Sequence, residues 1–340
     1  MKKFAVVFVA LALLAGLSCD VVAETLKIAT AAPEGSYWMK EMRAGAEEIS
    51  LRSQGRVQIR FFAGGVMGND KSVLRKVRIG QLHGGAFIAG SLEEIAPSIN
   101  ILSLPLVLRS YDEVDYVRVR MDPVLKDDLE KAGYACFGFA EGGFAHIMSP
   151  TPLRSIEDAR GLKIWVPEGD LIAYRAMSSL GLAPVTLPIT DVMTGLQAKL
   201  VEVVASSPIG ALAFQWHTKI KYVNTTPVSY LYATLVVDKR FFNKLSPGDQ
   251  ALVREVMGGI YARLNAYNRQ DNNQAIEAMK EQGITFLDST PEESARWHKI
   301  AAEVNQQFAA EGVFSAERYP MVIDLVREYR AGKTMAGKAN

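Results

Sequence analysis

The sequence predicts an α/β protein with two lobes and one long connecting helix. Short runs typical of strands alternate with segments whose apolar residues recur at helical spacing. This alternation favours parallel sheets joined by right-handed helical crossovers. The pattern starts again after Pro150, and residues 247–282 read as a single helix. A chain of 340 residues is long enough for two lobes.

The first half is expected to begin with a strand that alternates apolar and polar residues and then a helix that starts near Ser36. A second helix is expected over residues 69–79. Cys136 lies in an apolar run and is expected to be a buried thiol rather than a reactive one. The strands expected in this half are residues 26–30, 57–62, 84–89 and 136–139.

The second half contains expected strands at residues 163–166, 184–187 and 201–205. The long helix that follows has a capping residue at Ser246, proline at its first position and Gly283 at its end. About 36 residues make a helix of roughly 54 Å, longer than one lobe is wide. Its apolar stripe is too irregular for a coiled coil, so we expect it to cross behind both lobes.

The N-terminus resembles a secretory signal. Lys2-Lys3 precedes an uncharged, mostly apolar run over residues 4–17, and Val21-Val22-Ala23 has the small residues of a cleavage site. We expect residues 1–23 to be removed and the protein to be periplasmic. An uncleaved anchor is one alternative, and lipidation of Cys19 is another.

The composition argues against nucleic acid and anionic membranes as partners. The formal charge is +1, and loss of Lys2, Lys3 and Asp20 with the leader brings it to 0, so no basic excess remains. Cys136 is then the only cysteine, which leaves no internal disulfide.

No enzyme motif is evident. The four histidines lack metal-binding spacing, and there is no nucleophile elbow, dinucleotide fingerprint or P-loop. We therefore expect neither a catalytic group nor a cofactor or metal. His146 is the one histidine near the expected cleft, and a structural role is favoured for it.

Several motifs together resemble the solute-binding proteins of tripartite ATP-independent periplasmic (TRAP) transporters. Their order and spacing along nearly the whole mature chain carry the resemblance more than any one of them. The segments are LKIATAAPEGS at 26–36, GRV at 55–57, GGVMG at 64–68, SLPLV at 103–107, GLKIWVP at 161–167 and GLAPV at 181–185.

The resemblance implies a periplasmic-binding-protein fold with a central ligand cleft and hinge strands. The expected division is a signal peptide at 1–23, lobe I at 24–147 and lobe II at 148–235. Residues 236–279 then return to lobe I with the long helix, and residues 280–340 form C-terminal helices that pack on lobe II.

The ligand-binding motifs depart from the family. Trp165 stands where the family usually has a carboxylate-binding arginine, and Ala145 stands where many relatives have a second one. An indole offers a large apolar face and one N–H donor but no charge. Lys163, Arg154 and Arg175 are the cations that could replace the missing clamp.

The residues expected to line the cleft are strongly aromatic, which suits a solute held by stacking and burial. For Trp38 and Phe214 individually a core position is favoured, whereas Trp165 is expected to face the cleft without supporting the empty protein. The full set is Tyr37, Trp38, Phe87, Glu141, Phe144, Ala145, Trp165, Glu168, Ser206, Ser207, Phe214 and Trp216.

Three functions remain open from the sequence. The leading one is a receptor that closes on an apolar or aromatic solute and delivers it to TRAP integral membrane subunits. The resemblance also allows a tetratricopeptide-repeat lipoprotein as a partner. The alternatives are a receptor for an organic acid bound through a non-standard cation and a sensory protein whose closed form is recognised by a signalling partner.

Overall fold

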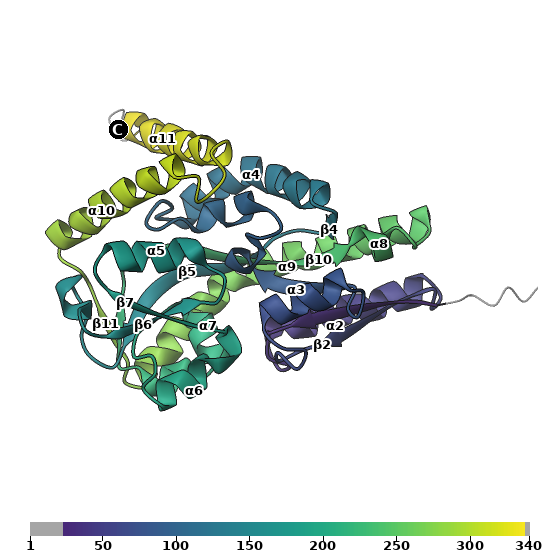
Figure 1. Cartoon of the computed structure of the whole chain (residues 1–340), viewed down its shortest axis with the longest axis horizontal. Helices are drawn as coiled ribbons and strands as arrows, with labels where there is room; N and C mark the ends of the chain where they lie inside the picture. The colour runs from purple at the N-terminus through teal and green to yellow at the C-terminus, as the bar shows by residue number, and fades with distance from the viewer. Residues whose placement is uncertain (1–22, 337–340) are drawn as a thin grey trace, which may run out of the picture.

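The computed structural model describes residues 23–336 and confirms the two-lobed α/β architecture (Figure 1). The expected leader and Cys19 lie outside the described residues. Cys136 is fully buried, as expected.

Lobe I is built on three neighbouring parallel strands, with β1 between β3 and β2. Ser36 and Asn69 accept hydrogen bonds from the first turns of α2 and α3, which fixes where these helices begin. The elements of this lobe are β1 (Glu24–Thr30), α2 (Tyr37–Arg52), β2 (Val57–Phe62), α3 (Asp70–Arg78), β3 (Gly84–Ile88), α4 (Tyr111–Lys131) and β4 (Tyr134–Cys136).

Two ten-residue strands, β5 (Ala140–Ser149) and β10 (Ser229–Asp238), pair with each other and run through both lobes. They join the strands into one hydrogen-bonded order, β11-β9-β5-β10-β3-β1-β2. Because β10 is antiparallel to β3 and to β5, the sheet is mixed and not purely parallel as the alternation predicted. The expected lobe boundaries near residues 148 and 236 fall inside these strands.

Lobe II carries a separate parallel pair, β6 and β7. An isolated bridge between Ile164 of β6 and Val203 joins this pair to the segment just before β8. Strand β8 begins three residues later than expected. The elements are β6 (Lys163–Pro167), α5 (Leu171–Ser179), β7 (Ala183–Leu187), α6 (Val192–Gln197), β8 (Val204–Ser206), α7 (Pro208–Ala213), β9 (Tyr222–Asn224) and β11 (Thr285–Leu287).

The long helix α9 (Pro247–Glu281) follows the short α8 (Lys239–Phe242) and crosses behind both lobes, as expected (Figure 1). It packs against α2 of lobe I and against α7 of lobe II. Gly143 of β5 has φ +87°, and a Cβ there would lie 2.7 Å from the side chain of Asn272. Glycine at this position lets β5 approach α9 closely.

The two C-terminal helices divide between the lobes. Helix α10 (Pro291–Ala310) packs against α5 of lobe II, whereas α11 (Arg318–Ala336) packs against α4 of lobe I (Figure 1). Ion pairs from Arg318 to Asp128 and from Arg330 to Glu113, each 2.8 Å long, hold α11 on α4. The expectation that both helices pack on lobe II is therefore wrong for α11.

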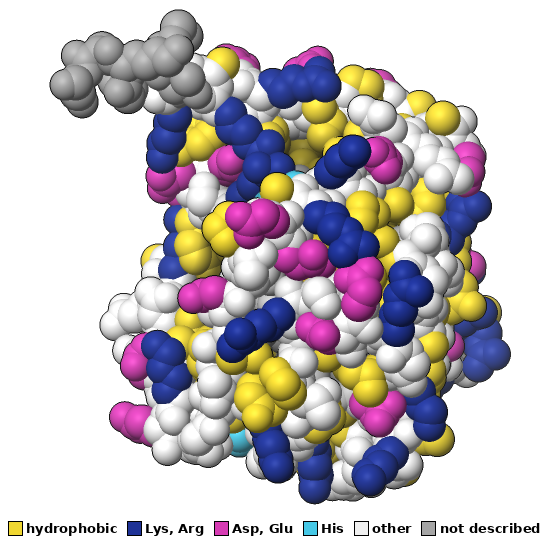
Figure 2. Space-filling view, turned by 90° about the vertical axis from the view of Figure 1, so that its left-hand side faces the viewer, with side chains coloured by type: hydrophobic (Ala, Val, Ile, Leu, Met, Phe, Trp, Pro, Cys, Tyr) yellow, Lys and Arg dark blue, Asp and Glu magenta, His cyan; other side chains and the backbone are white. Residues whose placement is uncertain are grey.

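The surface matches the near-neutral composition. Figure 2 shows basic and acidic side chains interspersed on the visible face, without an extended patch of one sign. Within residues 23–336, no helix combines the length and apolar character needed to cross a membrane.

Candidate functional site

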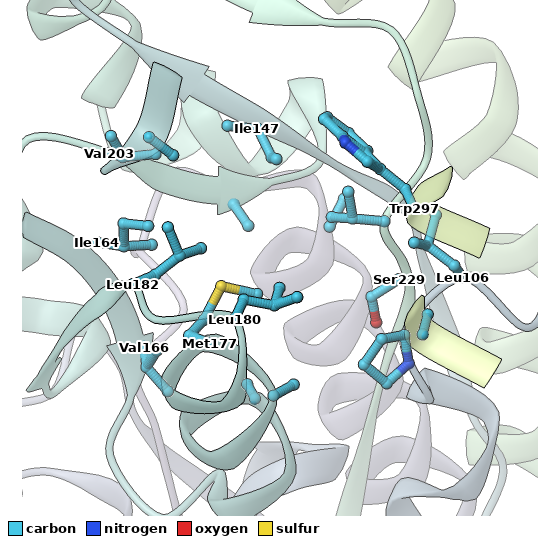
Figure 3. Close-up of a pocket in the computed structure, with 18 of the residues that line it drawn as sticks. Leu106, Ile147, Ile164, Val166, Met177, Leu180, Leu182, Val203, Ser229 and Trp297 are labelled. Carbon is cyan, nitrogen blue, oxygen red and sulfur yellow. The ribbon is translucent and has the colours of Figure 1, made fainter. Parts of the chain in front are cut away.

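An apolar cavity of about 190 Å³ lies between α5, α10, the strands β5, β6 and β8, the start of β10 and the loop at residues 103–106 (Figure 3). The walls are mostly aliphatic, and both α5 and α10 contribute to them. Residues labelled in the view are Leu106, Ile147, Ile164, Val166, Met177, Leu180, Leu182, Val203, Ser229 and Trp297.

The ionisable chemistry of the cavity wall is that of a single acid. Among the described residues that line it, Asp170 is the only ionisable one, and no lysine, arginine or histidine takes part. Asp170 also caps α5, since its Oδ1 accepts from the N–H of Ala173 at 2.9 Å. Burial raises the pKa of Asp170, because its charged form is poorly solvated there.

Trp165 lines the cavity but belongs to the core of lobe II. It is 5% exposed, its indole N–H donates to the carbonyl of Leu187 at 2.9 Å, and its ring meets Trp216 edge-on at 5.0 Å. Phe214 stacks on Trp216 in the same cluster. The expectation that Trp165 is free of the core is therefore wrong, because both its apolar ring and its single donor are already used.

Three further expected residues lie in β5 and β3. Ala145 is buried and lines the cavity. Phe144 is packed between Tyr111 and Tyr230, and Phe87 lies in the core of lobe I, so neither aromatic ring is open to a cleft.

Glu141 is likewise already paired within the protein. It is 2% exposed, forms a 3.0 Å ion pair with Arg269 of α9 and accepts from the hydroxyl of Tyr230. A buried carboxylate with these partners holds α9 against β5.

Several residues expected in the cleft serve local structure. Tyr37 packs edge-on against Tyr267 of α9, and Trp38 is partly buried against the core of lobe I. Ser207 caps α7 by accepting from the N–H of Gly210, and Ser206 is buried in β8.

The two lobes touch where Asn69 of lobe I donates to Glu168 of lobe II at 2.5 Å. This contact borders a small hollow of about 20 Å³ that also includes Asp70, Ile88 and Ile189. Burial, with a smaller contribution from the charge of Glu168, raises the pKa of Asp70. The segments after β1, β2 and β3 thus border lobe II here, but they enclose little space.

The three cations that could replace the missing clamp lie elsewhere. Lys163 is exposed and donates to the carbonyl of Lys199, Arg175 pairs with Glu311 at 2.9 Å, and Arg154 is exposed. None of the three lines the apolar cavity.

No group of three or more histidine, cysteine, aspartate or glutamate side chains in residues 23–336 could hold a metal ion. His146 shares a hydrogen bond with the carbonyl of Asn224, and burial lowers its pKa, which fits a structural histidine.

Sequence reasoning missed most of the cavity wall. Met177 of α5, Trp297 of α10 and Leu106 of the 103–106 loop come from three distant segments. The buried positions Ile172 and Ala176, four residues apart, mark the inner face of α5, but nothing in the sequence indicates that α10 packs opposite it.

Comparisons with known proteins agree with the fold. The family model described as bacterial extracellular solute-binding protein, family 7, matches residues 28–311. The C4-dicarboxylate-binding periplasmic protein DctP of Rhodobacter capsulatus is 24% identical over 270 residues, which cover 77% of this chain and 80% of that protein. The 2,3-diketo-L-gulonate-binding periplasmic protein YiaO of Escherichia coli is 25% identical over 251 residues, covering 70% and 73%.

Solved structures give the same result. A TRAP periplasmic solute-binding protein from Xanthobacter autotrophicus Py2 with bound β-D-galacturonate superposes with a TM-score of 0.80 at 20% identity, covering 90% of this chain and 99% of that one. The sugar-acid-binding protein DctPAm from Advenella mimigardefordensis, in complex with galactonate, reaches a TM-score of 0.83 at 19% identity, covering 91% and 99%.

Proposed function

Because this chain belongs to the bacterial extracellular solute-binding proteins of family 7, we propose that it is a periplasmic receptor that delivers its solute to the membrane subunits of a TRAP transporter. Membership of this family makes it a solute-binding protein and not an enzyme. The leader at residues 1–23 is the proposed export signal. Closure of the two lobes over the solute is the proposed form that the membrane partner recognises.

The proposed solute has a largely apolar body that fills the cavity between α5 and α10. The observation that carries this proposal is the apolar cavity of about 190 Å³, whose described lining contains no cation. Burial of apolar surface contributes roughly 25 cal/mol per Å². A carboxylate placed in the same cavity would lose its hydration without a cationic partner, at a cost of several kcal/mol.

A receptor for an organic acid is the second candidate, and the relatives favour it. One named relative is a C4-dicarboxylate-binding protein, and the two similar structures hold galacturonate and galactonate. An organic acid would need a cation such as Lys163, Arg154 or Arg175, and each of these is exposed or paired outside the cavity.

A thermal-shift screen separates the two candidates. The protein isolated from the periplasm is heated with 3-phenylpropan-1-ol, an apolar probe, and separately with succinate and galacturonate. A ligand at about 100 times its Kd adds about 2.7 kcal/mol of stability. Stabilisation by the alcohol but not by the two acids supports the proposal, and the reverse result overturns the apolar solute.

A matched pair of variants on α10 locates the site. Ala301 is 8% exposed and lines the cavity, whereas its neighbour Ala302 is exposed to solvent. Ala301→Leu should abolish stabilisation by the alcohol, and Ala302→Leu should retain it. Equal responses of the two variants would place the solute outside this cavity.

A further inference from the structure

Every side-chain hydrogen-bond donor in the cavity wall is already engaged by the protein. The wall contains three serines and two tryptophans with donor groups. The hydroxyl of Ser103 donates to the carbonyl of Tyr230 at 2.7 Å, and the hydroxyl of Ser229 donates to the carbonyl of Ser103 at 2.7 Å. Turning either hydroxyl toward a solute would leave a carbonyl without its partner.

The remaining side-chain donors of the wall are also engaged within the protein. The indole N–H of Trp297 donates to Glu293 at 2.7 Å, and the indole N–H of Trp165 donates to a main-chain carbonyl. The side chain of Ser155 hydrogen-bonds the carboxylate of Asp158, which can only accept. The serines and tryptophans of the described wall therefore offer no free side-chain donor to an acceptor group such as a carboxylate.

Acceptors, in contrast, are in excess at one end of the cavity. Asp170 accepts from Ala173, Ile172 and the amide of Asn100. A carboxylate has about four acceptor positions, so Asp170 can accept a hydrogen bond from one more donor.

Lobe I adds further acceptors behind Asp170. The amide nitrogen of Asn100 also donates to Glu93 at 2.8 Å, while its Oδ1 has no partner among residues 23–336 although Asn100 is only 2% exposed. Burial and the nearby charge of Asp170 raise the pKa of Glu93 to about 8. The amide of Asn100 thus links two carboxyl groups, Glu93 of lobe I and Asp170 of lobe II.

We propose that the solute carries a hydrogen-bond donor, a hydroxyl or an ammonium group, which Asp170 receives while the apolar body fills the cavity. This inference rests on the proposed function and names the polar end of the same solute. A donor supplies what the acceptor-rich end lacks, and an ammonium group would also stabilise the ionised form of Asp170. A carboxylate brings only acceptors.

Three probes with one apolar body test the head group. Isothermal titration calorimetry compares 3-phenylpropylamine, 3-phenylpropan-1-ol and 3-phenylpropanoate on the wild-type protein. The amine and the alcohol should bind at least about tenfold more tightly than the carboxylate, which corresponds to about 1.4 kcal/mol. Equal or tighter binding of the carboxylate would overturn the inference. If none of the three binds, the cavity is not the solute site and the proposed function fails with it.

Asp170→Asn tests the residue. Asparagine caps a helix about as well as aspartate, so α5 should keep its cap and the ligand-free melting temperature should change little. Binding of the amine should weaken about tenfold or more. Glu303→Gln removes one charge from the exposed face of α10 and should leave the affinity unchanged.

The two proposals fail in different ways. If Asp170→Asn leaves the amine and alcohol affinities unchanged while Ala301→Leu abolishes them, the cavity is the site but Asp170 does not receive the head group. If Ala301→Leu leaves all affinities unchanged, the cavity itself is not the solute site.

Discussion

The substitution Ala301→Leu should stabilise the empty protein while removing its ligand site. It adds three carbon atoms to a wall residue that is 8% exposed. A cavity of about 150 Å³ accommodates benzene, so the cavity of about 190 Å³ has room for them. Three buried carbons at about 0.8 kcal/mol each would contribute about 2.4 kcal/mol, and repacking strain lowers this to a net gain of about 1 kcal/mol.

Urea unfolding of the ligand-free protein measures this gain as a higher midpoint at an unchanged slope. Calorimetry on the same sample should detect no binding of 3-phenylpropan-1-ol. Ala302→Leu, one residue further along α10 and exposed, controls for the added leucine. If Ala301→Leu instead lowers the free energy of unfolding by more than about 1 kcal/mol, the wall is already fully packed, because extra carbons in a filled core cause strain.

Three further substitutions test the packing and the charges. Trp165→Ala should lower the free energy of unfolding of the ligand-free protein by about 3 to 5 kcal/mol, and a change below about 1 kcal/mol in urea unfolding would contradict its place in the core. Glu93 has a pKa raised to about 8, so stability should fall as the pH rises from its unfolded value toward 8. Glu93→Gln should remove this loss, with a higher melting temperature than wild type at pH 8 and a similar one at pH 4; equal differences at both pH values would refute the shift. Arg269→Ala leaves Glu141 buried without its cation and should cost about 3 kcal/mol in thermal unfolding, whereas a neutral effect would show that Tyr230 alone satisfies the carboxylate.

Local patterns in the sequence predict much of the fold. The strand at residues 57–62 and the long helix after Ser246 have nearly the expected bounds, because alternation, a cap and a terminal glycine are local signals. The long shared strands β5 and β10 could not be delimited in this way. They cross from one lobe to the other, and their pairing depends on contacts between residues about 85 positions apart, such as Phe144 with Tyr230.

The site is less predictable than the fold. Ala145 and Trp165 were expected at the site and do line the cavity. Trp165 is held in the core by its ring contact with Trp216 and by its hydrogen bond to the carbonyl of Leu187. Neither partner can be assigned to it from local sequence. Glu141 is neutralised by Arg269, 128 residues away, so its structural role appears only once α9 is packed against β5.

A crystal structure of the protein with 3-phenylpropan-1-ol is the most direct test of the central claim. The account predicts the phenyl ring between α5 and α10, beside Met177 and Trp297, with the hydroxyl directed to Asp170. Density for the ligand at the contact between Asn69 and Glu168, with the cavity between the two helices empty, would contradict it.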